Sequence, residues 1–194
     1  MIKILIYSLV FLVAIVIAVL AYNMLSSGPY TENKTYSGTI DINRYSGTWY
    51  QILEARNNNS WLFEKMEKTQ GTCYATRVVY EAVGTKLQLR NSCNDGGFDG
   101  REVSITGIVT PQNASNTKLK VRFDPWYLRA FTFDYWIVDI DPNYQLVTLS
   151  SPKSKGITIL SRVPIPDKAL YEKAKANAEA LGYDLSKSMI SPQR

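Results

Sequence analysis

Two pairs of side chains in this sequence are candidates for covalent or catalytic chemistry. They are the two cysteines, Cys73 and Cys93, and two aspartates that lie close together in the sequence, Asp139 and Asp141. Cys73 and Cys93 are centred on Val83 and Gly84 and lie in segments with strand-like composition, so a hairpin would bring the thiols together. In an oxidising compartment such a pair forms a disulfide, and closing a loop of about 20 residues stabilises a fold by roughly 3 kcal/mol. Two free thiols are the alternative, and a reactive thiol or the paired carboxylates could then serve an enzyme.

Histidine is absent, which removes the commonest metal ligand and the usual general base of a nucleophile pair. This argues against triad hydrolases and zinc enzymes, so we expect a protein that is not an enzyme and holds no metal or cofactor. The net charge is +5, with 22 basic and 17 acidic residues spread along the chain. Because no basic run alternates with aromatic residues, nucleic acid is not an expected partner.

The amino-terminal segment has the composition of a membrane-targeting helix. Residues 4–22 carry no charge, and nineteen such residues are roughly what a helix needs to cross about 30 Å of hydrocarbon. We expect a signal anchor at residues 1–22, a tether at 23–39 and one folded domain at 40–194. Lys3 favours a cytoplasmic amino terminus, which places the domain on the extracytoplasmic side, in a periplasm, a lumen or the cell exterior. If the segment is instead a signal peptide that is cleaved, the domain is secreted.

Strand patterns recur through the domain, separated by turn signals. The expected strands are residues 48–55, 73–81, 86–92, 101–110, 118–123, 135–139, 145–150 and 156–161. Eight successive antiparallel strands with mostly short links predict a mainly β fold, an up-and-down barrel with room for one small ligand. Asp167 then caps an expected helix at residues 168–181, whose apolar stripe would pack outside the barrel.

Three motifs resemble those of the lipocalin family. They are Gly47-Thr48-Trp49 in the first strand, residues 139–144 after the sixth strand, and Ser161-Arg162 at the end of the eighth. The similarity covers residues 40–193 and is closest to the bacterial lipocalin and apolipoprotein D group, although Pro142 stands where the family usually has a tyrosine. The resemblance implies a structural motif of Gly47, Trp49, Asp141 and Arg162, in which the Arg162 guanidinium lies over the Trp49 ring at the closed end.

The resemblance also sets the phase in which strand residues face inward. The expected cavity lining is Gln51, Leu53, Ala55, Tyr74, Thr76, Val78, Tyr80, Leu119, Val121, Phe123, Thr158 and Leu160. Such an apolar lining with a few hydroxyls suits a small lipophilic ligand, a fatty acid or a lysophospholipid-like lipid.

The expected open end carries two apolar loops, one with Trp61, Leu62 and Phe63 and one running from Trp126 to Phe133. Exposed apolar clusters usually contact a partner, so we expect these loops to touch a membrane or a ligand. Basic residues flank them and could bind an anionic head group: Lys65, Lys68, Arg129, Lys153 and Lys155. Two other functions stay open, a lipid-modifying enzyme on the same barrel and a surface module whose barrel is solid.

Overall fold

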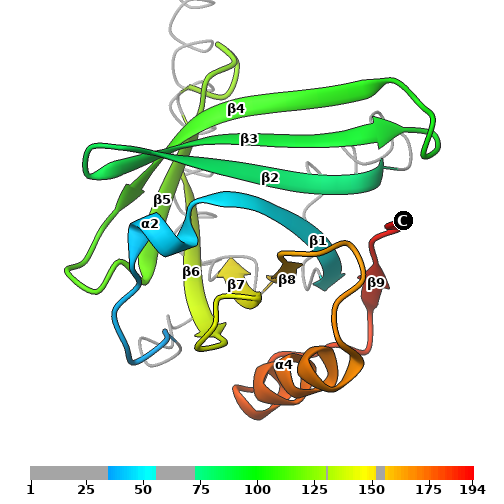
Figure 1. Cartoon of the computed structure of the whole chain (residues 1–194). Helices are drawn as coiled ribbons and strands as arrows, with labels where there is room; N and C mark the ends of the chain where they lie inside the picture. Colours follow the sequence, from blue (N-terminus) through cyan, green and yellow to red (C-terminus); the bar gives the residue numbers. More distant parts are fainter. Residues whose placement is uncertain (1–34, 56–72, 130, 152–155) are drawn as a thin grey trace, which may run out of the picture. The chain divides into compact units, whose positions relative to one another are not determined.

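An eight-stranded antiparallel barrel forms the domain, as predicted, in a computed structural model that describes residues 35–55, 73–129, 131–151 and 156–194 (Figure 1). The strands lie close to the predicted ranges. They are β1 (Gly47–Ala55), β2 (Cys73–Val83), β3 (Lys86–Asp95), β4 (Glu102–Pro111), β5 (Lys118–Phe123), β6 (Phe133–Ile140), β7 (Leu146–Ser151) and β8 (Gly156–Ser161).

Strand β1 closes the barrel by pairing on both of its edges. Each strand from β2 to β8 pairs with the next along the chain, and β1 then pairs with β8 on one edge and with β2 on the other. The β2 pairing covers residues 47–50, and the β8 pairing covers residues 50–55. The closed sheet separates an inner from an outer face, and β1 pairs with β2 only at residues 47–50 of β1.

The short helix α2 (Ile42–Tyr45) leads into β1. Its first turn is capped by Asp41, whose carboxylate accepts the backbone N–H of Asn43 at 2.8 Å. Gly47 follows with a φ of +101°, and a Cβ there would lie 3.1 Å from Nη1 of Arg162. Glycine is therefore needed both for the backbone conformation and for the approach of the guanidinium.

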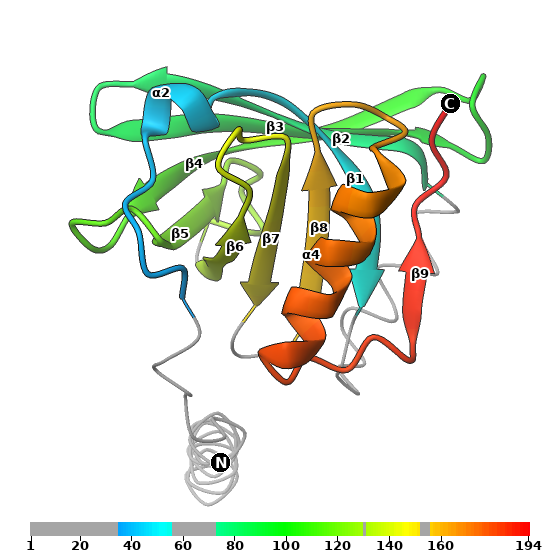
Figure 2. The ribbon, with the colours of Figure 1, turned by 60° about the horizontal axis from the view of Figure 1, so that its bottom comes forward.

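Helix α4 (Lys168–Ala180) packs against the outside of the barrel across β6 and β7 (Figure 2). The helix is confirmed, with Asp167 accepting the N–H of Leu170 at 2.9 Å and Gly182 ending it at a φ of +81°. Its buried residues are the small Ala174 and Ala178, which let the helix approach the sheet closely. The outer core beneath it consists of Leu53, Ala55, Trp136, Val138, Leu146, Ile157, Ile159, Ala174, Ala178 and Leu185.

The chain ends in a strand that was not predicted, β9 (Ser188–Ile190), which pairs with residues 53–55 of β1 (Figure 2). Residues 47–50 of β1 pair with β2 on the same edge. Strand β9 therefore takes the place of β2 beside the second half of β1, at residues 53–55. Beyond β9, the side-chain amide of Gln193 donates to the carbonyls of Gln51 and Thr76, each at 2.9 Å. Residues 188–194, the C-terminal strap, thus bridge β1 and β2 where these strands separate.

The predicted disulfide between Cys73 and Cys93 is present, so two free thiols were the wrong alternative. Cys73 pairs in the ladder with Asp95, and the bridge therefore runs diagonally between β2 and β3, with a Cα–Cα distance of 5.4 Å. A reactive thiol is excluded as a catalytic group, because both cysteines of the chain are in the bridge.

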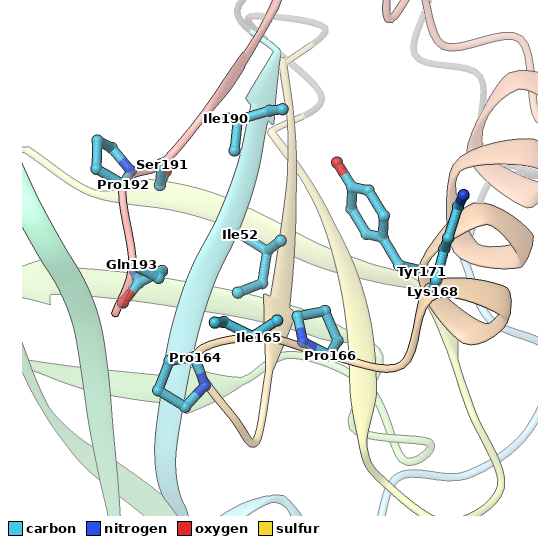
Figure 3. A pocket seen from close by; sticks show the side chains of 10 residues that line it. All are labelled: Ile52, Pro164, Ile165, Pro166, Lys168, Tyr171, Ile190, Ser191, Pro192 and Gln193. Atoms are coloured by element: carbon cyan, nitrogen blue, oxygen red, sulfur yellow. The ribbon is translucent and has the colours of Figure 1, made fainter.

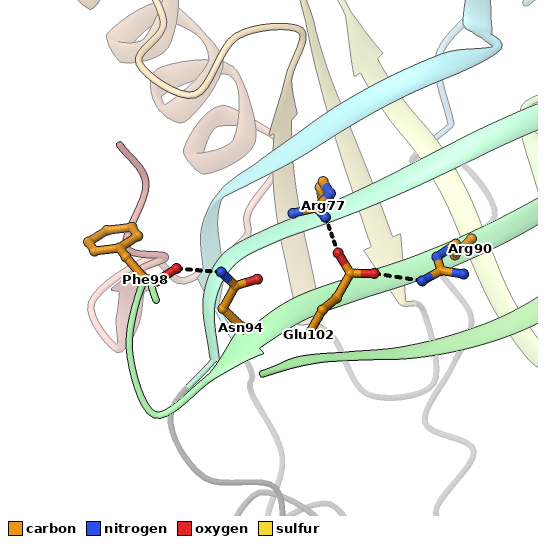
Figure 4. A network of polar contacts seen from close by, with 5 residues as sticks. All are labelled: Arg77, Arg90, Asn94, Phe98 and Glu102. Carbon is orange, nitrogen blue, oxygen red and sulfur yellow. Dashed lines mark hydrogen bonds and ion pairs between the residues drawn. The ribbon is translucent and has the colours of Figure 1, made fainter. Parts of the chain in front are cut away.

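The outer face of β2, β3 and β4 carries an ion-pair network (Figure 4). Arg90 donates to Glu102 at 2.6 Å and Arg77 donates to the other carboxylate oxygen. The hydrogen bond from Arg90 is the main cause that lowers the pKa of Glu102. Because these polar side chains mark the outer face, the alternate residues of the same strands, such as Val78 and Leu89, face the interior.

None of the helices in the described ranges is long and apolar enough to cross a membrane. The predicted anchor at residues 1–22 lies outside the described residues.

Candidate ligand-binding site

A group of buried aromatic side chains forms the floor of the barrel. The guanidinium carbon of Arg162 lies 3.8 Å from the centre of the Trp49 ring, and Trp49 Nε1 donates to the Tyr45 carbonyl at 2.8 Å. Tyr45 packs between two rings, with centroid distances of 5.5 Å to Trp49 and 5.1 Å to Tyr80. Trp49 and Tyr45 are both 0% exposed, so the floor closes this end of the barrel.

Arg162 ties the floor to three parts of the chain. Its Nη1 donates to the Thr48 carbonyl at 3.1 Å, its Nη2 to the Tyr45 carbonyl at 3.2 Å, and its Nε to the Tyr144 carbonyl at 3.3 Å. Partial burial lowers the pKa of Arg162, but an arginine starts so high that the group stays charged. The residue therefore satisfies backbone acceptors and packs on an indole, which is a structural role.

Burial raises the pKa of two floor phenols, Tyr45 and Tyr80. Desolvation is the largest cause for both, because an ionised phenolate would lose its hydration inside the barrel. Both hydroxyls are consequently neutral at physiological pH, and the floor presents a surface without ionised phenols.

The inner wall above the floor is mainly apolar. The interior cluster includes the predicted lining residues Val78, Tyr80, Leu119, Val121 and Leu160, with Phe123 partly buried against it. Thr158 lies opposite Leu149, another member of the cluster, and Gln51 lies opposite Leu160. These positions share the interior; contact of any of them with a ligand stays a prediction.

The inward-facing side chains of the wall are buried near the floor and half-buried towards the opposite end of the barrel. On β4, Val109 near the floor is buried, whereas Ile105 further up the strand is half-buried; on β5 and β6, Phe123, Phe133 and Tyr135 are also half-buried. Phe123 and Phe133 meet edge to face, with centroids 5.4 Å apart. The inward-facing apolar residues thus keep exposed area only above the sealed floor, and we refer to this upper part of the barrel interior as the cup.

The expected inward orientation of Leu53 and Ala55 is wrong. The register against β8 shifts between Gln51 and Leu53, which inserts Ile52 as an extra residue and reverses the faces that follow. Leu53 and Ala55 consequently lie in the outer core with α4.

The bulge instead places Glu54 on the inner face, opposite Thr158. The sequence carried a signal for this placement, because the adjacent apolar pair Ile52 and Leu53 interrupts the alternation between Gln51 and Glu54.

The expected inward orientation of Tyr74 is wrong for a similar reason. The β2–β3 register shifts between Tyr74 and Arg77, where Ala75 has a φ of +51°. Tyr74 pairs with Asn94 on the outer phase of β3, and its ring packs on Phe98 with centroids 5.1 Å apart. Thr76 lies within the irregular stretch, and its carbonyl accepts the bond from the C-terminal strap.

The rim of the cup exposes aromatic residues in the loop between β5 and β6. Trp126 is 82% exposed, Tyr127 58% and Phe131 56%. A pocket of about 370 Å³ beside them is lined by Arg122, Phe123, Asp124 and Arg129. The other predicted rim residues lie outside the described residues: Trp61, Leu62, Phe63, Lys65, Lys68, Lys153 and Lys155.

A second pocket, of about 440 Å³, lies where α4, the segment before it, β1 and the C-terminal strap meet (Figure 3). Ile52, the bulged residue, belongs to this pocket with Ile165 and Ile190, which are 75% and 73% exposed. The bulge thus gives β1 two apolar contacts at once, Ile52 in this groove and Leu53 under α4.

The two aspartates considered for catalysis have structural partners. Asp139 accepts a hydrogen bond at 2.8 Å from Asn177 of α4, and Asp141 accepts the N–H of Gln145 at 2.7 Å in the turn before β7. Asp139 therefore belongs to the outer packing of α4, and Asp141 to the closed-end turn that also holds Tyr144. Neither contributes to the cup.

Comparisons with known proteins agree with this geometry. The family model for a lipocalin-like domain matches residues 40–193. Temperature-induced lipocalin-1 of Arabidopsis thaliana is 26% identical over 162 residues, which cover 79% of this chain and 80% of the relative. A lipocalin of Acanthamoeba polyphaga mimivirus is 29% identical over 154 residues, covering 76% of this chain and 82% of the viral protein.

Solved structures show the same fold at low sequence identity. Insecticyanin from the tobacco hornworm Manduca sexta has a TM-score of 0.61 at 13% identity, covering 85% of this chain and 87% of that protein. A lobster apocrustacyanin has a TM-score of 0.57 at 16% identity, covering 84% and 93%. With the barrel, its closed floor and the family match over residues 40–193 together, the chain belongs to the lipocalin-like family.

Proposed function

We propose that this protein binds a small hydrophobic molecule in its barrel, a fatty acid or a lysophospholipid-like lipid, and transports or sequesters it at a membrane surface. The main support is the change of the apolar inner wall from buried at the floor to half-buried above it. Burying a ligand's apolar surface there is favourable by about 25 cal/mol per Å². Membership of the lipocalin-like family supports the same kind of ligand.

Within the family, we place the chain in the bacterial lipocalin and apolipoprotein D-like group, on the motifs of the sequence. The barrel would lie on the extracytoplasmic side, anchored by residues 1–22, or would be secreted if that segment is cleaved. The disulfide supports this location, because such bridges persist in oxidising compartments.

The rim loop is the proposed membrane contact of the barrel itself. Trp126, Tyr127 and Phe131 are more than half exposed, and Arg122 and Arg129 lie beside them. Aromatic side chains favour the membrane interface, and arginines attract anionic head groups. A rim of this composition would bring the open end of the cup to a bilayer that contains such lipids.

Ligand-dependent melting tests the binding proposal. Oleate or lysophosphatidylcholine should raise the melting temperature of the wild type, since a ligand that binds only the folded state stabilises it. Phe123→Arg places a charge on the half-buried inner wall and should remove most of the rise. The matched control is Gln88→Arg on the exposed outer face of β3, which should melt with the full rise.

Two results would count against the proposal. If no tested lipid raises the melting temperature of the wild type, the barrel is better explained as a solid surface module. If Phe123→Arg and Gln88→Arg respond alike, Phe123 does not line the binding space. Native mass spectrometry of protein purified from its own membrane, followed by lipid extraction, would identify the ligand directly.

A further inference from the structure

The outside of the barrel carries a groove that is distinct from the cup. It is the pocket of about 440 Å³ between α4, the segment before it, β1 and the C-terminal strap, and we call it the α4 groove (Figure 3). Ile52 of the β1 bulge lies between the helix side of this groove and the strap side. The volume is within the range of about 300 to 1,000 Å³ that is usual for sites holding one small ligand.

Two exposed isoleucines border the α4 groove. Ile165 precedes α4 and Ile190 belongs to β9, and they are 75% and 73% exposed, the largest fractions of any aliphatic side chain in the described ranges. Exposed apolar clusters usually mark a binding surface. Pro164 and Pro166 each fix their own φ and restrict the residue before them, so the segment that carries Ile165 keeps its shape without a ligand.

The polar side chains on the strap side of the groove already have partners. Ser191 Oγ accepts a hydrogen bond from the Gln51 amide at 2.9 Å, and the Gln193 amide donates to two backbone carbonyls. An extended peptide in the groove would therefore find few partners for its N–H and C=O groups, and burying these groups unpaired is unfavourable. A hydrocarbon chain has no such groups and is stabilised by each apolar contact.

The helix side of the groove carries a positive charge. Lys168 lines the groove, and no carboxylate is among the residues that line it. The acidic residues near Lys168 in the sequence have other partners: Asp167 accepts the N–H of Leu170 at 2.9 Å, and Glu172 pairs with Lys175 at 3.1 Å. Lys168 forms no ion pair within the part of the chain that the structure describes. An anionic group is therefore the electrostatic complement of this side.

We propose that the α4 groove is a second binding site, which takes a single-chain amphiphile with an anionic head group, such as a fatty acid. The hydrocarbon chain lies on Ile52 between Ile165 and Ile190, and the head group lies against Lys168. This inference does not rest on the proposed function, because the residues that line the groove are different from those of the cup.

Photolabelling of the full chain tests the position of the site. Dodecanoic acid with a diazirine at the chain end would be added to the protein in phospholipid nanodiscs and irradiated, and the labelled peptides would be identified by mass spectrometry. Label is expected in residues 163–173 and 188–193. Ile165→Asp, at an exposed position, should keep the fold and lower this label at least about tenfold, because it places a charge on the apolar wall.

Val83→Asp is the matched control for the apolar wall. Val83 is also an exposed aliphatic residue, at 57%, but it lies at the end of β2 outside the groove. The substitution should leave the label in the groove unchanged. Circular dichroism and melting would verify that both variants keep the wild-type fold.

A second pair of variants tests the head group. Lys168→Gln should lower the groove label from the photoreactive acid about fivefold, since one exposed charge pair is lost, and should hardly affect label from the corresponding alcohol. Lys173→Gln is the matched control, because Lys173 is exposed on the same helix but does not line the groove. This variant should label like the wild type with both probes.

The outcomes separate the groove site from its alternatives. Equal groove label in Ile165→Asp and Val83→Asp, or no label in the groove of the wild type, would overturn the site. An unlabelled groove together with a dimer that Ile165→Asp converts to a monomer in native mass spectrometry would identify an interface between copies instead. Equal label in Lys168→Gln and Lys173→Gln would overturn the preference for an anion.

Label in the barrel interior is read from different peptides and bears on the proposed function alone. If the groove is labelled and the inner wall is not, the groove site stands while binding in the cup fails. If the inner wall is labelled and the groove is not, the groove site is overturned while the proposed function stands.

Discussion

At the scale of single residues, Trp49 and Arg162 show how two side chains distant in sequence close one end of a barrel. The indole is 0% exposed, its N–H is satisfied by the Tyr45 carbonyl, and its face is covered by the guanidinium. Each of these contacts is formed within the floor, well below the half-buried part of the wall. The pair therefore has a structural role, whereas contact of a wall residue such as Phe123 with a ligand stays a prediction.

We predict that Trp49→Ala lowers the free energy of unfolding by roughly 3 to 5 kcal/mol, as the loss of a large buried aromatic does. Chemical denaturation would measure this loss. The variant should retain the wild-type order of lipid affinities once it is folded, because Trp49 lies in the floor. A loss below about 1 kcal/mol would show that the floor is not close-packed around the indole.

At the scale of elements, the C-terminal strap completes the upper wall where β1 and β2 separate. Ser191 N–H donates to the Ile52 carbonyl at 2.9 Å, Ala75 N–H donates to the Pro192 carbonyl at 2.9 Å, and the Gln193 amide bridges both strands. Arg194 then pairs with Asp99 in the loop after β3 at 2.9 Å. Where β1 and β2 no longer pair with each other, the strap thus supplies hydrogen-bond partners to the backbone of both strands.

We predict that Gln193→Ala destabilises the fold by about 1 to 3 kcal/mol, since two carbonyls in the half-buried seam lose their donor. Amide hydrogen exchange should increase at β9 and in the upper half of β2 and stay slow in β6 and β7. Arg194→Ala is the comparison: its ion pair with the 89% exposed Asp99 is on the surface and should contribute less than about 1 kcal/mol. Equal effects of the two substitutions would contradict a specific role for the Gln193 bridge.

At the scale of the whole molecule, buried phenols link stability to alkaline pH. The pKa values of Tyr45 and Tyr80 are raised by burial, whereas an unfolded chain ionises its tyrosines near pH 10. Above that pH the unfolded state binds fewer protons than the folded state, so stability falls as pH rises. Below about pH 10 both states hold these protons, and the two phenols give no pH dependence.

Denaturation curves measured across this range should therefore show a decline in unfolding free energy that begins near pH 10. Tyr45→Phe should make the decline shallower, because phenylalanine has no proton to lose. Tyr127→Phe, at a position 58% exposed on the rim, should leave the slope as in the wild type. A decline of the same slope in all three proteins would exclude the floor phenols as its cause.

The sequence by itself determined the strand ranges to within a few residues, the capped helix, the pairing of the two cysteines and the meeting of the first and last strands. These features depend on local patterns: alternation within each strand, Asp167 before the helix, Gly182 after it, and cysteines spaced evenly about a turn. The inward-facing positions on β5 followed from this alternation with the phase that the family resemblance set, because the ladder of β5 with its neighbours has no register shift.

Only the tertiary structure decided which face of β1 carries Glu54, which face of β2 carries Tyr74, and where the chain end lies. A bulge adds one residue and reverses every side chain beyond it, and its position depends on how distant strands align when the barrel closes. Strand β9 has three residues, too few to show an alternation of polar and apolar residues in the sequence. It forms because residues 53–55 of β1 have an edge that β2 does not pair with. Alternation is a local property of a strand, whereas register and edge pairing are properties of the closed sheet.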